Sequence, residues 1–394
     1  MRNYLAFLLL ILTSHTAMNQ SLDDYLEVAL QNNPDLKAAY FSFEAQLEKV
    51  EQVKFLANPT LGFGYFIAPI ETRLGSQQTK ISLSQMFPWF GTLSAKKDVA
   101  SLMAASQFEH FRSKQALLTF EVKTAYYNYL EALELLEIHR QNLSIMKSHK
   151  NMAKIAYSNG KSKNTEVLDA NLMLDEITSN IHILDQRLNL LQRSFNRLLN
   201  RPDSLEITAT TLAAPTDFET NKDPDSLLTH HPKMAALEQQ MAAAIIDENV
   251  ARKNGLPQIG VGIDYMIIQP LDGSTVKNNG KDALMPMISL SLPIFRKKYQ
   301  SQTREIQLYQ KQLAAQKTQL QNTLAIEWAT AQNQRFESQA QYDLDEKRIQ
   351  NAHQEITFAF SDFRVANGDF KNILEAQKNL LKFKLSQVTW KRNY

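Results

Sequence analysis

The chain has 394 residues, and its 43 lysines and arginines nearly balance its 41 aspartates and glutamates. The net charge of +2 provides no basic surface of the kind that binds nucleic acid. Cysteine is absent, which excludes disulfides, thiolate nucleophiles and thiolate metal sites. Glycine and proline number only 11 and 12, so the composition favours long, uninterrupted helices.

The N-terminal residues have the pattern of an export signal. Arg2 supplies a positive charge, an apolar run from Leu5 to Leu12 follows, and small residues lead to Ala17. We therefore predict a signal peptide at residues 1–17, and a buried N-terminal strand or helix is the alternative. The run is shorter than the roughly 20 residues that span a bilayer, and no later apolar run reaches about 18 residues. The expected mature chain is exported and has no transmembrane helix.

The remaining chain contains two copies of one structural unit. In the first copy, Asn33-Pro34 and Asn58-Pro59 have the same spacing as His231-Pro232 and Leu256-Pro257 in the second. Three further pairs of segments also match: 60–65 with 258–263, 87–90 with 292–295, and 166–170 with 372–376. The predicted division is a first repeat at 21–200 with a hairpin at about 59–89, a linker at 201–225, and a second repeat at 226–394 with a hairpin at about 257–294.

Each repeat is predicted to contain the same elements in the same order. A first helix covers about 21–57 or about 224–254, and it ends before an X-Pro step that disfavours helix. Two strands come next. A long helix of about 91–158 or 295–365 follows, which would extend roughly 100 Å at about 1.5 Å per residue. After a break, a last helix covers about 164–200 or 369–390.

Apolar residues alternate with small or polar residues in the four predicted strands. In the first, Leu61, Phe63 and Tyr65 share one face, while Gly62 and Gly64 occupy the other. Each strand has about ten residues, which suffices for a tilted strand to cross a bilayer. Aromatic residues near the strand ends favour a membrane location over the alternative, which is a pair of hairpins packed on a soluble core. Four strands cannot close a membrane barrel, so a membrane location requires oligomerisation.

The two long helices repeat apolar residues at spacings of three and four, and polar residues fill the remaining positions. Leu130, Leu133 and Leu136 are examples in the first helix. This pattern predicts a helix that is buried on one face and hydrated on the other. A stave of a helical tube and a solvated coiled-coil spacer are both consistent with it.

The duplicated order of helix, hairpin, long helix and helix resembles the TolC-type outer-membrane factors, the outer membrane efflux protein family. Tyr157-x-x-Gly160 followed by residues 166–170 is similar to the helix-turn-helix at that family's periplasmic tip. The resemblance covers nearly the whole mature chain. It implies a mainly α fold with membrane β-hairpins, in which a homotrimer forms a twelve-stranded β-barrel continuous with a periplasmic α-helical barrel.

The same resemblance implies where such a chain resides and what it contacts. The expected location is the outer membrane of a diderm bacterium, with the helices extending into the periplasm. The implied partners are two further copies of the chain, outer-membrane lipid, a periplasmic adaptor protein and an inner-membrane pump.

The resemblance also implies which residues form a gate at the periplasmic tip. The acidic rings that close several family members fall on Asn372 and Glu375, so one ring lacks its charge here. A ring of Glu375 carboxylates is expected to favour cations, and a solvated glutamate near a helix end is the alternative. In the second turn Ala366 replaces the expected glycine, and Gly368 is the candidate for the left-handed residue.

An interhelical lock in the family falls on Thr165 and Glu166 in the first repeat and on Phe363 and Gly368 in the second. Phe363 lacks the hydroxyl that the family's lock uses, and Gly368 lacks the positive charge. The complete set of candidate gate residues is Tyr157, Gly160, Thr165, Glu166, Phe363, Gly368, Asn372 and Glu375.

No constellation of residues in the sequence points to catalysis or to a metal or cofactor site. No two histidines have zinc-ligand spacing with a nearby acid, and the glycine doublets lack a nucleotide-binding context. His230-His231 before Pro232 is interpreted as a helix entry, with metal binding as the alternative. We therefore predict a passive, non-enzymatic export channel, and a periplasmic or surface coiled-coil scaffold is the alternative. Metal ions, drugs and peptides all remain open as cargo.

Overall fold

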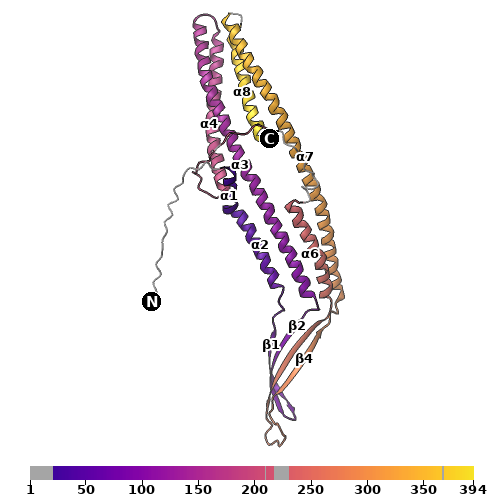
Figure 1. The fold of residues 1–394 in the computed structure, drawn as a ribbon. Helices are drawn as coiled ribbons and strands as arrows, with labels where there is room; N and C mark the ends of the chain where they lie inside the picture. The colour runs from indigo at the N-terminus through magenta and orange to yellow at the C-terminus, as the bar shows by residue number, and fades with distance from the viewer. Residues whose placement is uncertain (1–20, 209, 217–229, 366–367) are drawn as a thin grey trace, which may run out of the picture. The chain divides into compact units, whose positions relative to one another are not determined.

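The computed structural model describes residues 21–208, 210–216, 230–365 and 368–394, so the predicted signal peptide and part of the predicted linker lie outside it. The described residues are mainly helical and include one antiparallel sheet (Figure 1). None of these helices has the length and the apolar character that crossing a bilayer demands. In chain order the elements are α1 (Leu22–Asn32), α2 (Pro34–Gln52), β1 (Thr60–Thr72), β2 (Gly75–Phe87), α3 (Thr92–Ser158), α4 (Asn164–Leu198), α6 (Pro232–Asn254), β3 (Gln258–Gln269), β4 (Ala283–Ser291), α7 (Arg296–Arg364) and α8 (Phe370–Asn393).

Two helices, α1 and α2, replace the single first helix that the sequence predicts. Asn33 has an extended backbone (φ −61°, ψ 125°), because the ring of Pro34 disfavours the helical conformation at the preceding residue. The Asn33 side chain accepts hydrogen bonds from the backbone N–H groups of Asp35 (3.0 Å) and Leu36 (3.1 Å) and thereby caps α2. The prediction of one continuous helix was therefore wrong.

The second repeat uses the same local structure at the start of α6. His231 precedes Pro232, has an extended backbone (φ −69°, ψ 131°), and its Nδ1 accepts a hydrogen bond from Lys233 N at 3.2 Å. The interpretation of His231 as a helix entry is confirmed. Residues 224–229, which the sequence assigns to this helix, lie outside the described residues.

The four strands form one antiparallel sheet in the order β1-β2-β3-β4. β2 and β3 belong to different repeats, and their pairing sets Ile81 opposite Tyr265 and Leu83 opposite Ile263. Because side chains alternate along a strand, this register gathers most of the large aliphatic and aromatic residues of the four strands on one face. Among the described residues, β1 and β4 pair with no other strand on their outer sides, so the sheet has two open edges.

The chain divides into two compact units, and each contains segments of both predicted repeats. The helical unit comprises the described residues of 1–37, 115–221 and 327–394. The sheet unit comprises the described residues of 38–114 and 222–326. The long helices α3 and α7 contribute residues to both units.

Aromatic packing holds α1 in the helical unit. Tyr25 is fully buried, and its ring centroid lies 5.1 Å from that of Phe195 on α4 and 6.0 Å from that of Tyr126 on α3. The guanidinium carbon of Arg201 lies 4.9 Å from the centroid of the Tyr25 ring, a favourable cation–π geometry. Arg201 Nε also donates a hydrogen bond to Asn196 Oδ1 at 2.7 Å. These contacts join α1, α3, α4 and the segment that follows α4.

Candidate gate and membrane-facing surface

One face of the sheet is apolar and exposed. The register aligns Phe63, Ile81, Tyr265 and Leu284 in one row across the four strands. Phe63 is 74% exposed and Leu284 is 63% exposed. Large apolar groups arranged in such rows form a surface that lipid or protein must cover.

The opposite face of the sheet carries small and charged side chains together with several methionines. Asp264 of β3 is fully buried, and its Oδ2 lies 2.5 Å from Lys80 Nζ of β2. This ion pair links strands from the two repeats. A Cβ atom at Gly62 would lie only 2.5 Å from Ser82 Oγ, so a larger residue there would require the Ser82 side chain to rotate.

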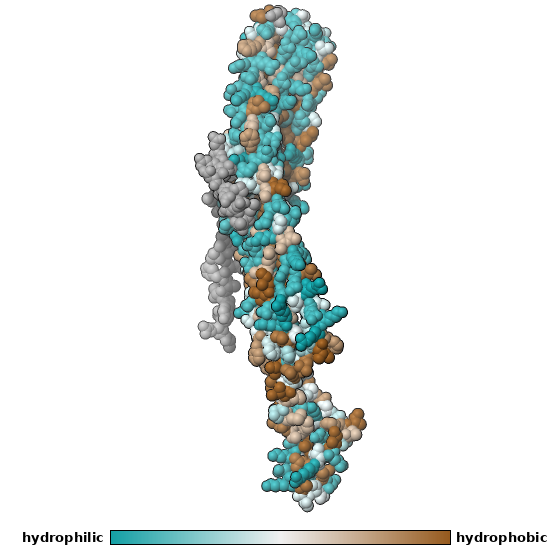
Figure 2. All heavy atoms as spheres, turned by 90° about the vertical axis from the view of Figure 1, so that its right-hand side faces the viewer, coloured by the Kyte–Doolittle hydropathy of each residue, from teal (hydrophilic) through white to brown (hydrophobic). Residues whose placement is uncertain are grey.

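Large apolar side chains are also exposed where the strands meet the helices. Phe90 before α3 and Phe295 before α7 occupy corresponding positions in the two repeats, and each is 77% exposed. Figure 2 shows hydrophobic surface gathered at the helix-proximal ends of the strands. Aromatic residues concentrate at the boundary between hydrocarbon and headgroups, so this girdle suits the edge of a membrane.

The first candidate gate turn joins α3 to α4. α3 ends in a Schellman motif, in which Lys161 N donates to Ala156 O (2.9 Å) and Gly160 N donates to Tyr157 O (3.0 Å). Gly160 has a φ of +68°, a left-handed conformation that glycine adopts without strain. No atom lies within 4 Å of a Cβ built at Gly160, so the backbone conformation, not lack of space, accounts for glycine. Tyr157 is half-exposed.

Glu166 is buried at this turn, where its carboxylate accepts a hydrogen bond from Ser162 Oγ. The neighbouring Thr165 is exposed. The carboxylate of Glu166 therefore contributes to the structure of the turn. Sequence reasoning missed Ser162, although its position four residues before Glu166 is a signal that could have found it.

The second candidate gate turn joins α7 to α8. The rings of Phe363 and Phe370 flank it, with centroids 5.4 Å apart, and Phe370 is almost completely buried. Phe363, where the resemblance implies a hydroxyl, is thus part of an apolar cluster. Ala366 lies outside the described residues. Gly368 does not have the positive φ of the left-handed conformation, so that prediction was wrong. A Cβ atom at Gly368 would lie 3.0 Å from Asp362 Cβ and 3.4 Å from Phe363 N, so the close approach to the end of α7 favours glycine there.

Asn372 and Glu375 lie exposed on α8. Glu375 is 60% exposed, and its Oε1 lies 3.5 Å from Lys371 Nζ one turn earlier. Sequence reasoning missed Lys371, although its spacing from Glu375 is that of a helical ion pair. Among the described residues, no hydrogen bond or ion pair joins the candidate gate residues of the first turn to those of the second.

An apolar core connects the helices beside both turns. α3, α4 and α8 all contribute buried residues to it, and Gln377 Nε2 donates a buried hydrogen bond to Asn142 Oδ1 at 2.8 Å. The core consists of Met146, Ala153, Val167, Ala170, Leu174, Ile177, Phe370, Ile373 and Leu374. Residues from both repeats therefore stabilise one another near the candidate gate.

His149 of α3 is buried against this core. Its ring centroid lies 5.6 Å from that of Phe360 and 6.4 Å from that of Phe370, and its Nδ1 has no hydrogen-bond partner among the described residues. Burial lowers the pKa of His149, because the imidazolium loses its hydration. Burial also lowers the pKa of His139 on the same helix, although the charge of Glu176 opposes this shift.

We expect the helical unit to lose stability on mild acidification. The pKa values of His139 and His149 are lower in the folded state than the unfolded value of about 6.5, so the unfolded state binds protons first as the pH falls. Above about pH 6.5 the titration of the two histidines does not change the free energy of unfolding. Below that pH, each histidine lowers the free energy of unfolding by at most about 1.4 kcal/mol per pH unit. Urea unfolding at a series of pH values measures this slope.

The variant His149→Leu should make that slope shallower, because it removes one of the two titrating groups. His353→Gln is the matched control, since His353 is exposed on α7 and its replacement should leave the slope unchanged. A slope that His149→Leu does not alter would contradict the prediction.

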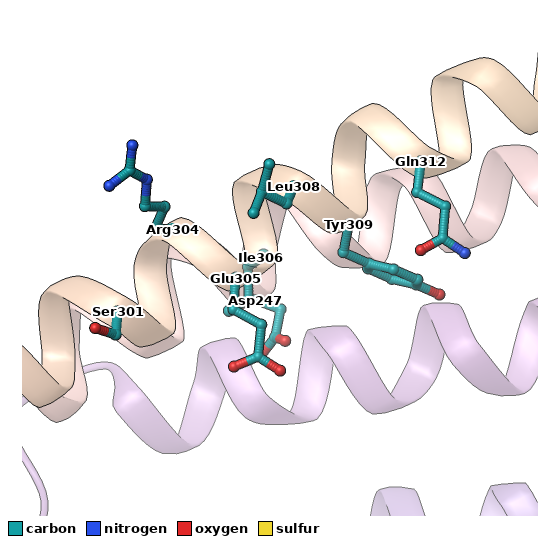
Figure 3. Close-up of a pocket in the computed structure, with 8 residues that line it drawn as sticks. All are labelled: Asp247, Ser301, Arg304, Glu305, Ile306, Leu308, Tyr309 and Gln312. Carbon is teal, nitrogen blue, oxygen red and sulfur yellow. The ribbon is translucent and has the colours of Figure 1, made fainter.

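A cavity of about 660 Å³ in the sheet unit is bordered by α6 and α7 (Figure 3). Asp247 of α6 and Glu305 of α7 direct their carboxylates to the same side, whereas Arg304 points away. Burial, together with the charge of Glu305, raises the pKa of Asp247. No group of three or more histidine, aspartate or glutamate side chains in the described part of the chain is placed to hold a metal ion.

Comparison with known proteins identifies this architecture. The family model of the outer membrane efflux proteins matches residues 25–198. No curated protein sequence matches the chain. The fold is similar to crystal structures of CusC, with a TM-score of 0.80, 16% identity, and coverage of 94% of this chain and 88% of that one.

Two further solved structures have the same fold. The outer membrane protein VceC of Vibrio cholerae has a TM-score of 0.76 at 17% identity, over 94% of this chain and 92% of that one. The open state of the Neisseria gonorrhoeae MtrE outer membrane channel has a TM-score of 0.78 at 15% identity, over 94% of this chain and 86% of that one. The resemblance found in the sequence is confirmed: the model of the outer membrane efflux protein family matches the first part of the chain, and the chain has the fold of the TolC-type outer-membrane factors.

Proposed function

We propose that the chain is the outer-membrane component of a tripartite export system and acts as a passive conduit. The observation that carries this proposal is the sheet, with its exposed apolar face and two open edges. In a bilayer an open edge leaves backbone N–H and C=O groups without partners, so β1 and β4 must pair with other copies. Three copies supply twelve strands, which can close into a barrel with room for a pore.

The helical unit would then lie in the periplasm, where its turns meet a periplasmic adaptor and, through it, an inner-membrane pump. The pump supplies the energy, so transport requires no chemistry from this chain. Both turns are proposed to form the gate, with the core around Phe370 holding the helices of the two repeats together.

Closure of the sheet between copies predicts a specific pattern of disulfide cross-links. Leu61 and Phe63 of β1, and Ile288 and Leu290 of β4, lie on the exposed apolar face at the open edges. Paired strands bring Cα atoms within about 7 Å, so at least one combination of a β1 cysteine and a β4 cysteine should yield covalent trimers on oxidation. The natural chain contains no cysteine, so it forms no disulfide cross-links of its own.

The matched control places both cysteines inside one chain, at Leu83 and Ile263, which lie opposite each other in β2 and β3. This variant should form an intramolecular disulfide and run as a monomer on a denaturing gel. A chain that stays monomeric without detergent and forms no β1–β4 cross-link would contradict the channel and favour the scaffold alternative.

Charge at the second turn predicts the ion selectivity of the gate. Three Glu375 carboxylates would favour cations, and each Lys371 ammonium beside them offsets part of that potential. In planar bilayers, Glu375→Gln should lower the ratio of cation to anion permeability, whereas Lys371→Gln should raise it. If the ion selectivity is unchanged in Glu375→Gln, Glu375 does not contribute to the selectivity of the gate.

A further inference from the structure

A groove of about 440 Å³ lies between α4 and α8 in the helical unit. His139 of α3 also lines it, and Ile177, Leu381 and Leu385 give it an apolar lining. Its volume falls within the roughly 300–1,000 Å³ of small-molecule sites, which combine an apolar lining with a few convergent polar groups.

The charged groups of this groove are mostly positive. Lys378 and Lys382 stand one helical turn apart on α8, and neither makes a hydrogen bond or ion pair with any described residue. Glu176 of α4 is the acidic residue among the lining side chains. The groove therefore carries two unpaired ammonium groups against one carboxylate.

A buried polar atom is also left without a partner at this place. His139 is 6% exposed, and its Nδ1 makes no hydrogen bond within the described part of the chain. Buried polar groups in folded proteins are nearly always satisfied, so the orphaned imidazole is an exception at this place. Its Nδ1 is covered, however, so the two lysines and the apolar lining are the groups that a ligand in the groove would contact.

We propose that this groove binds a small anionic amphiphile. Lys378 and Lys382 hold its acidic group, and its apolar chain lies on Ile177, Leu381 and Leu385. The ligand bridges α4 of the first repeat and α8 of the second. This assignment concerns binding to the chain itself and does not depend on the proposed channel.

Calorimetric titration of decanoate into the full-length protein, purified in an uncharged detergent, tests the proposal. Saturable binding with one site per chain is expected, and Lys378→Gln/Lys382→Gln should weaken it by about tenfold or more. Lys147→Gln/Lys154→Gln is the matched control, since it removes the same charge from exposed positions on α3 and should leave the affinity unchanged. Decanol, which has the same chain length and no charge, should bind more weakly and show no response to the lysine changes.

Glu176→Gln separates a binding defect from a folding defect, because removing the carboxylate should make decanoate bind more tightly. A gain in affinity cannot come from a misfolded chain. Equal affinity of decanoate for the natural chain and the Lys378→Gln/Lys382→Gln variant would overturn the proposal, as would equal binding of decanol.

Discussion

Replacing Phe370 with alanine should destabilise the helical unit by about 3–5 kcal/mol, the usual cost of removing a large buried aromatic ring. Phe370 is 1% exposed and contacts Phe363 and His149, so its loss leaves a cavity between helices of the two repeats. Urea unfolding followed by far-ultraviolet circular dichroism measures the change in unfolding free energy. Hydrogen exchange should accelerate most in α4 and α8, which contribute residues to this core.

Phe370→Leu is the graded control, because leucine keeps most of the apolar volume. Its cost should stay below about 1.5 kcal/mol. Two results would contradict the role of this core in holding α8 in place. One is an equal loss of stability in both variants, and the other is a loss below about 1.5 kcal/mol in Phe370→Ala.

Replacing Lys80 with methionine should destabilise the assembled protein by about 3–5 kcal/mol, because it leaves the buried Asp264 carboxylate without its counter-charge. The penalty arises from the unpaired charge and far exceeds the small value of an exposed ion pair. The fraction of heat-resistant oligomer on a denaturing gel, together with urea unfolding in detergent, measures the loss.

The double variant Lys80→Met/Asp264→Asn completes a double-mutant cycle. Because asparagine carries no charge and has nearly the same shape as aspartate, the double variant should recover most of the stability that Lys80→Met loses. A double variant that is less stable than Lys80→Met would show that the ion pair does not account for the loss.

Local patterns in the sequence predicted much of the fold. Period-two alternation located the strands, and the ends of α3 and α7 differ from their predicted ends by at most one residue. The break at Asn33 was missed, although the residue before a proline disfavours the helical conformation. The pairs Ser162–Glu166 and Lys371–Glu375 were missed too. The second pair follows from helical spacing alone, whereas Ser162 precedes the first residue of α4.

Contacts between residues far apart in the chain could not be predicted. Asn142 and Gln377 form a buried hydrogen bond, and Lys80 and Asp264 form an ion pair, but no periodicity relates the partners. The candidate gate shows the same limit. Sequence similarity placed Glu166 and Glu375 at the tip, yet one carboxylate is buried in a turn and the other lies exposed beside a lysine.

The sequence by itself determined the lengths of α3 and α7, the faces of the strands and the turn at Gly160. These features depend on neighbours within about four residues, where backbone sterics and side-chain periodicity act directly. Only the tertiary structure decided that β2 pairs with β3, that Phe363 joins an apolar core, and that Asp264 meets Lys80. Those outcomes depend on burial and on the exclusion of water, which arise only when segments distant in the chain come together.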